Sequence, residues 1–121
     1  PYQELISELT IKEFLNFHKK FRNSITDYNK ILKKFNLYKY IDTKIENLSS
    51  GSIQKLRLII SFYSDSEFIL LDEPTTNLDS EGKKNYLEVL NEFADKKGII
   101  IATNDKEDII EKNTSIINLD N

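Results

Sequence analysis

The apolar residues in the first half of the chain recur at helical spacing. Thr10 and Glu13 form a capping-box pattern, which predicts that a helix begins at this point. A second helix is predicted from residue 24 or 26 to residue 35, and a third from 49 or 50 to about 63. The stretch 36–48 between them is predicted to be irregular. The first helix should bury one stripe, made of Ile11, Phe14, Leu15, His18 and Phe21.

After the polar break at residues 64–66, the pattern changes to short apolar runs. The runs at 68–71 and 99–102 are of the kind found in strands that are buried on both faces. A helix that begins at Asp79 or Ser80 and ends near residue 95 is predicted between them. A short helix over 105–112 and a third strand over 115–119 should follow. Strands that alternate with helices predict a parallel sheet, so the fold class is α/β.

Composition excludes several kinds of site. The glycines are Gly51, Gly82 and Gly98, and their spacing fits neither the phosphate-binding loop G-x-x-x-x-G-K-[ST] nor a dinucleotide-binding fingerprint. With no cysteine and one histidine, disulfides, thiolate metal sites and a Ser-His-Asp triad are not expected. The net charge of -3 provides no general attraction to nucleic acid, and no apolar run is long enough to cross a membrane.

Two short motifs carry candidate chemistry. Asp72 and Glu73 follow a predicted strand, at the edge where open α/β sheets bind ligands. The sequence L-S-S-G-S at 48–52 places small residues at a helix start, where backbone N–H groups and the helix dipole can receive a phosphate. Taken singly, each motif has an ordinary alternative: a solvated acidic turn for the first, and a serine-capped helix for the second.

Four motifs together resemble the nucleotide-binding domain of ABC ATPases. The segment 48–52 resembles the L-S-G-G-Q signature, and F-I-L-L-D-E-P at 68–74 resembles the Walker B strand with its glutamate. N-L-D at 77–79 resembles the D-loop, and T-N-D at 103–105 stands where the family has T-H-D. The order and the intervals agree with the family, and the resemblance covers residues 1 to about 119.

The resemblance implies an incomplete cassette with the P-loop NTPase (RecA-like) fold. Residues 1–64 would form the helical subdomain with the signature motif. Residues 65–121 would form the C-terminal part of the ATPase core, with the Walker B strand, the D-loop and the switch loop. The chain lacks a P-loop and begins with Pro1, so we expect it to be a piece of a longer protein and inactive alone.

Family roles can be transferred to matching positions. The resemblance implies that Asp72 holds Mg²⁺ and that Glu73 acts as general base, with Asn104 in the place of the switch histidine. The residues expected to contact ATP bound to a second subunit, or to couple the two sites, are Ser49, Ser50, Gly51, Ser52 and Asp79.

Three departures from the family pattern bear on activity. Ser50 replaces the first signature glycine, and Ser52 replaces the glutamine. Asn104 replaces a histidine, and an amide can donate a hydrogen bond to phosphate but cannot carry a positive charge. We therefore expect hydrolysis that is slower than usual, or that depends wholly on Glu73.

The resemblance favours the ATP-hydrolysing subunit of a membrane transporter, with ATP and Mg²⁺ as cofactors. Its implied partners are a second nucleotide-binding domain in a head-to-tail dimer and a transmembrane permease, without nucleic acid. It would lie in the cytoplasm, at the inner face of the cell membrane. Two alternatives stay open: a soluble ABC ATPase of translation or DNA maintenance, and a regulatory cassette with weakened hydrolysis.

Overall fold

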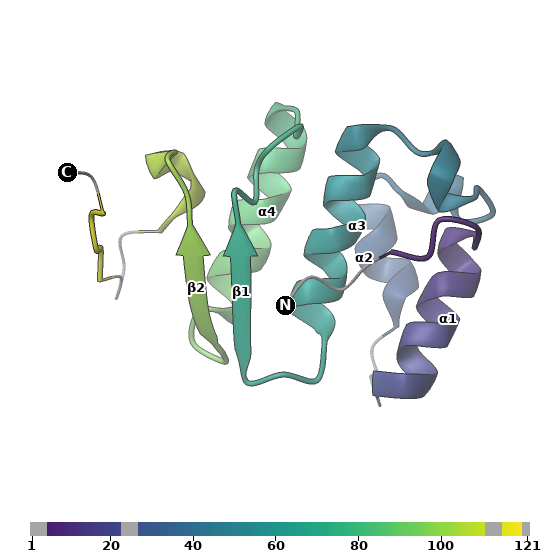
Figure 1. The fold of residues 1–121 in the computed structure, drawn as a ribbon, viewed down its shortest axis with the longest axis horizontal. Helices are drawn as coiled ribbons and strands as arrows, with labels where there is room; N and C mark the ends of the chain where they lie inside the picture. The colour runs from purple at the N-terminus through teal and green to yellow at the C-terminus, as the bar shows by residue number, and fades with distance from the viewer. Residues whose placement is uncertain (1–4, 23–26, 111–114, 120–121) are drawn as a thin grey trace.

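The computed structural model describes residues 5–22, 27–110 and 115–119 (Figure 1). A helical part comes first and a small sheet with one covering helix follows. The helices and strands are α1 (Ile11–Arg22), α2 (Tyr28–Lys34), α3 (Ser50–Tyr63), β1 (Phe68–Asp72), α4 (Ser80–Phe93) and β2 (Gly98–Ala102). Three single 3₁₀ turns lie between or after them, at η1 (Tyr38–Tyr40), η2 (Ile45–Asn47) and η3 (Lys106–Asp108).

Helix α1 begins with the predicted capping box. The Thr10 N–H donates to Glu13 Oε1 at 3.0 Å, and the Glu13 N–H donates to Thr10 Oγ1 at 3.1 Å. These hydrogen bonds lower the pKa of the Glu13 carboxyl, because they favour its charged form. His18 is buried in the same helix, and its Nδ1 lies 3.0 Å from the Tyr28 hydroxyl. His18 is therefore a hydrogen-bonded core residue.

Helix α2 begins at Tyr28, where the Asp27 side chain accepts the Asn29 N–H. The predicted starts at residues 24 and 26 lie outside the described residues, as does the side chain of Phe21. The stretch 36–48 contains the two turns η1 and η2 rather than wholly irregular chain.

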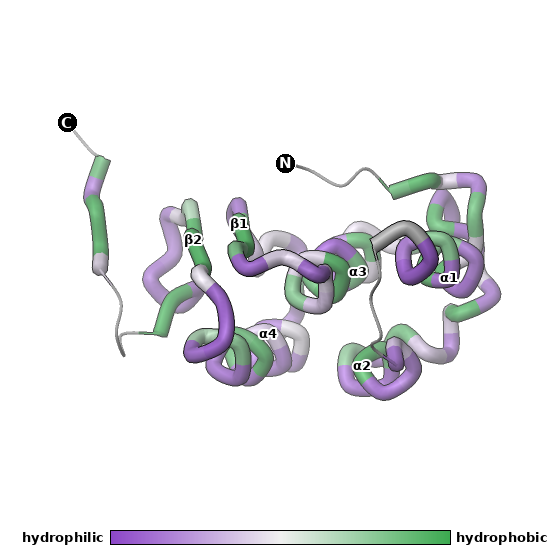
Figure 2. Tube along the Cα trace, turned by 90° about the horizontal axis from the view of Figure 1, so that it is seen from below, coloured by the Kyte–Doolittle hydropathy of each residue, from purple (hydrophilic) through white to green (hydrophobic). Residues whose placement is uncertain are grey.

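Strands β1 and β2 form a parallel sheet, as the alternating pattern predicts. Their register runs from Phe68 opposite Gly98 to Asp72 opposite Ala102. Figure 2 shows helix α4 on one side of the two strands. Ile69 and Leu71 point to the buried side.

The opposite face of this sheet is open, so the prediction of strands buried on both faces is wrong for the described residues. Phe68, Leu70 and Ile100 expose 69%, 58% and 61% of their surface. The cause is that helix α4 covers one face, and no other described element covers the second (Figure 2). A run of apolar residues in the sequence predicts an apolar strand, but the neighbouring helices and strands decide which of its faces is buried.

Two predictions for the end of the chain are also wrong. Residues 115–119 form no strand, because within the described chain the sheet contains only β1 and β2 and no ladder holds a third strand. The helix predicted over 105–112 is a single 3₁₀ turn, η3, in its described part. Within the described residues no helix is long and apolar enough to cross a bilayer.

Aromatic packing joins α3 and α4 beside the sheet. The Phe62 and Phe93 rings stack with centroids 5.7 Å apart, and Tyr63 meets Phe93 edge-on at 5.1 Å. Lys97, which precedes β2, donates to the carbonyl oxygens of Phe62 at 3.0 Å and Ser64 at 2.6 Å. It thereby satisfies carbonyl groups at the end of α3, while burial lowers the pKa of its ammonium group.

Candidate functional site

The predicted site residues gather at one end of the molecule. Figure 1 shows the carboxyl ends of β1 and β2 at the same end as the N-terminal ends of α3 and α4. Parallel strands bring their carboxyl ends to one edge, and each helix directs its positive dipole end and its first N–H groups there. This edge can therefore receive an anionic ligand.

The serines of the signature segment cap helix α3. Ser49 is the N-cap residue, and its Oγ accepts the Ser52 N–H at 3.1 Å. The same hydroxyl donates to Ser52 Oγ at 3.0 Å. Ser49 and Ser50 are exposed. The other N–H groups of a first helical turn have no intrahelical acceptor, so they are suited to a phosphate oxygen.

Gly51 is needed for a close approach between this helix and the D-loop segment. A Cβ at Gly51 would lie 2.8 Å from the Asn77 carbonyl oxygen, which is shorter than real Cβ contacts. Asn77 has a φ of 65°, a left-handed conformation that asparagine tolerates better than most residues. The Gln54 side chain also donates to the Pro74 carbonyl at 2.9 Å. Helix α3 is thus fixed to the turn that follows β1.

Glu73 and Asn104 are brought together across the two strands. The Glu73 N–H donates to the Ala102 carbonyl at 2.8 Å, which extends the ladder by one bond. The Glu73 carboxylate accepts the Asn104 N–H at 3.2 Å, and its other oxygen lies 3.3 Å from Thr103 Oγ1. The Asn104 side chain is exposed at the same edge.

Asp72 lies on the open face of the sheet, in line with Phe68 and Leu70. Among the described residues no group of three or more His, Cys, Asp or Glu side chains could hold a metal ion. Mg²⁺ is commonly held by one or two carboxylates together with substrate phosphates and water. A single exposed carboxylate at the strand end fits that use, and Asp72 is the residue that would hold the ion.

Asp79 has a structural role of its own. It is the N-cap residue of α4, and its Oδ1 accepts the Gly82 N–H at 2.7 Å. This bond fixes the start of α4 directly after the segment that packs on Gly51.

Asp108 is a residue of this edge that the sequence did not single out. It exposes 1% of its surface, and its two carboxylate oxygens accept hydrogen bonds from the Thr75 and Thr103 hydroxyls. Its backbone carbonyl accepts the Tyr86 hydroxyl at 2.6 Å. Burial, and then the charge of Asp108, raise the pKa of Tyr86 and keep that hydroxyl protonated. No motif marks Asp108, since an acid in a short polar stretch is normally expected at the surface.

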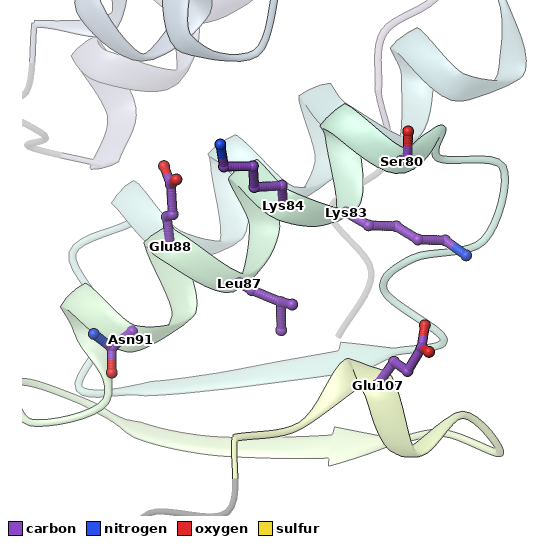
Figure 3. A pocket seen from close by; sticks show the side chains of 7 residues that line it. All are labelled: Ser80, Lys83, Lys84, Leu87, Glu88, Asn91 and Glu107. Atoms are coloured by element: carbon purple, nitrogen blue, oxygen red, sulfur yellow. The ribbon is translucent and has the colours of Figure 1, made fainter.

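A separate hollow of about 530 Å³ lies between α4 and η3 (Figure 3). Its lining is formed by Ser80, Lys83, Lys84, Leu87, Glu88, Asn91 and Glu107. It includes none of the predicted site residues, and its lining comes from α4 except for Glu107, which lies in η3. We assign it no role in the site.

Known proteins match this chain in sequence and in fold. A family model described as "ABC transporter" matches residues 2–76. The "Probable ABC transporter ATP-binding protein p29" of Mycoplasma pneumoniae is 34% identical over 93 residues, which are 75% of this chain and 38% of p29. The "Zinc import ATP-binding protein ZnuC" of Wigglesworthia glossinidia brevipalpis is 30% identical over 111 residues, which are 90% of this chain and 47% of ZnuC.

A solved structure described as "Structure of ATP binding subunit of ABC transporter" superposes with a TM-score of 0.72 at 25% identity. The match covers 83% of this chain and 44% of that one. The chain therefore spans less than half the length of each of these three proteins.

The structure is a partial α/β cassette of the P-loop NTPase class. The features that define it are the parallel sheet, the acidic residues at the end of β1, the two helix N-termini at the same edge and the similarity to the solved structure. The family model covers more than half of the chain. The chain therefore belongs to the ABC transporter family.

Proposed function

We propose that this chain is part of the ATP-binding and ATP-hydrolysing subunit of an ABC membrane transporter. Residues 1–64 serve as the helical subdomain, and residues 65–121 as the C-terminal part of the ATPase core. The phosphate-binding loop, which the 121 residues do not contain, comes from a part of the protein outside this chain. We call the two parts together the complete cassette.

The contact between Glu73 and the Asn104 N–H is the observation that supports this proposal most. This hydrogen bond holds the Glu73 carboxylate at the edge of the sheet where the strands end. A water molecule that attacks a γ-phosphate bound at this edge would need a proton acceptor there. Asp72, one residue earlier, would hold Mg²⁺ at the same strand end. The bound ion would supply positive charge next to the phosphates.

A second cassette completes the site in this proposal. The exposed start of α3, with Ser49, Ser50, Gly51 and Ser52, contacts the γ-phosphate of ATP bound to the partner subunit. Asp79, which begins α4 beside that surface, couples the two sites across a head-to-tail dimer. The assembly lies at the cytoplasmic face of the membrane, on a transmembrane permease, and needs no nucleic acid.

Replacement of Glu73 tests the proposal directly. In the complete cassette, Glu73→Gln should lower the ATP hydrolysis rate by a factor on the order of 10²–10⁴, because a proton acceptor is lost, while Mg-ATP still binds. Glu67→Gln, an exposed acid just before β1, is the matched control and should hydrolyse ATP at the wild-type rate. Unchanged hydrolysis by Glu73→Gln would contradict the assignment of Glu73.

Two other functions would give different results. A regulatory cassette would bind Mg-ATP, but Glu73→Gln would not lower its ATP hydrolysis rate. A soluble ABC ATPase hydrolyses ATP but does not associate with a membrane subunit. Membrane flotation of the complete cassette from lysates of its native cells separates this last case from a transporter subunit.

A further inference from the structure

A buried carboxylate stands between the two loops of the candidate site. Asp108 exposes 1% of its surface, and a carboxylate removed from water is costly unless it is hydrogen-bonded. The one ion pair formed within the described part of the chain joins Lys34 and Glu88, so hydroxyl groups, not a cation, compensate Asp108. Each of its oxygens accepts one threonine hydroxyl.

The two threonines belong to different loops. Thr75 lies in the turn that follows β1, two residues after Glu73, and that turn is closed by the bond from the Thr76 N–H to the Glu73 carbonyl at 3.1 Å. Thr103 directly follows β2 and precedes Asn104. A single carboxylate therefore ties the loop of the glutamate to the loop of the switch position.

Distances decide where the Thr103 hydroxyl hydrogen lies. Its oxygen is 2.5 Å from Asp108 Oδ2, against 3.3 Å from Glu73 Oε2 and 3.4 Å from the Asp105 carbonyl. A hydroxyl has one hydrogen to donate, so the donation goes to Asp108. The Thr103 oxygen accepts the Asp105 N–H at 2.9 Å. The Glu73 carboxylate is consequently held by the Asn104 N–H.

Helix α4 anchors Asp108 from below. The Tyr86 hydroxyl donates to the Asp108 carbonyl at 2.6 Å, and Tyr86 is fully buried. The carboxylate is thus fixed to a rigid helix that packs under the sheet.

We propose that Asp108 is a positioning residue for ATP hydrolysis: it holds Thr75 and Thr103 together, and thereby places the Asn104 N–H against the Glu73 carboxylate. This inference rests on the proposed function, because it assigns Asp108 to the same reaction. Asp108 is buried, so we assign it a role through Thr75 and Thr103 and not through contact with a nucleotide.

The first test is the kinetics of the complete cassette with Mg-ATP. Asp108→Asn keeps the side-chain volume but replaces one carboxylate oxygen by an NH2 group, so one threonine hydroxyl loses the acceptor of its hydrogen. Since small displacements of a catalytic group are costly, we expect kcat to fall about tenfold or more with the KM for ATP nearly unchanged. Glu107→Gln removes a neighbouring exposed carboxylate and should leave both constants at their wild-type values.

A double-mutant cycle protects the test against simple misfolding. Thr75→Val removes one hydroxyl and leaves the side chains of Asp108, Asn104 and Glu73 themselves unaltered. It should also lower kcat, but it should add little further loss in the Asp108→Asn background, because the two changes break the same link. Fully additive losses in kcat would overturn the proposal.

Amide hydrogen exchange tests the positioning independently of hydrolysis. The Asn104 N–H should exchange severalfold faster in Asp108→Asn and in Thr75→Val, while the Leu90 amide in the middle of α4 keeps its wild-type rate. Unchanged exchange at Asn104 in both variants would disprove the positioning role. If the wild-type complete cassette hydrolyses no ATP, the proposed function fails, and exchange at Asn104 still decides whether Asp108 sets this geometry.

Discussion

Glu73 adopts an unusual backbone conformation, with a φ of 45°. Such a conformation costs a residue with a Cβ about 1–2 kcal/mol, so surrounding contacts must hold it. The bonds from the Glu73 N–H to Ala102 and from the Asn104 N–H to the carboxylate do so. The motif predicts the identity of this residue, but the strain and its compensation come from the neighbouring strand.

The residue at position 104 gives a prediction at this scale. Asn104→His introduces an imidazole that can hydrogen-bond a γ-phosphate oxygen and also become protonated. We expect faster ATP hydrolysis by the complete cassette, by about tenfold, since a charge-assisted bond replaces a neutral one in the transition state. The measurement is steady-state kcat, with Asn104→Gln as a control that lengthens the side chain without adding charge. Equal rates for Asn104→His and wild type would refute the idea that Asn104 limits turnover.

At the scale of elements, helix α3 is placed by its contacts with the turn after β1. Helical spacing and the serine cap predict its bounds well, because these are local features. The contact of Gly51 with the Asn77 carbonyl was not predictable, since the two residues are far apart in sequence and one of them is in a turn. Phosphate binding by Gly51 stays a prediction, whereas the close packing of Gly51 on the turn is seen in the structure.

Gly51→Ala tests the packing of α3. Alanine within a helix gains about 0.5–1 kcal/mol over glycine, but a Cβ 2.8 Å from a backbone oxygen forces the turn to move. Overpacking of this kind costs about 1–3 kcal/mol, so we expect a net destabilisation of about 1 kcal/mol. Urea unfolding of the complete cassette measures it. Ser50→Ala, an exposed change in the same turn, should alter stability by less than about 0.5 kcal/mol.

At the scale of the whole molecule, the open face of the sheet is the dominant feature. Phe68, Leu70 and Ile100 form an apolar surface that no described element covers (Figure 2). Contiguous exposed apolar surface and unpaired strand edges promote association.

We therefore predict that the 121-residue chain by itself self-associates. Leu70→Lys should weaken association at least tenfold, because burying a leucine side chain contributes about 1.5–3 kcal/mol. Asn91→Lys adds the same charge at an exposed polar position of α4 and serves as the control, because it removes no apolar surface. Light scattering over a concentration series measures the effect, and a monomer at every concentration would contradict the prediction.

The sequence by itself determined the order of the motifs and the type of each helix and strand from α1 to β2, although not the end of the chain. The capping box at Thr10 and Glu13, the serine cap of α3 and the parallel pairing of two strands joined through α4 all follow from residue spacing and side-chain type. The same holds for membership in the ABC family, because motifs are contiguous in the chain.

Tertiary structure alone decided which surfaces are buried and which distant groups meet. The strand patterns predicted burial on both faces, yet one face is open, because burial depends on neighbouring elements rather than on the strand. The bonds of Asp108 to Thr75 and Thr103 join segments that local pattern cannot connect. These hydrogen bonds form only when the turn after β1 and the loop after β2 lie at the same edge of the sheet. That arrangement arises when β1, β2 and α4 pack together.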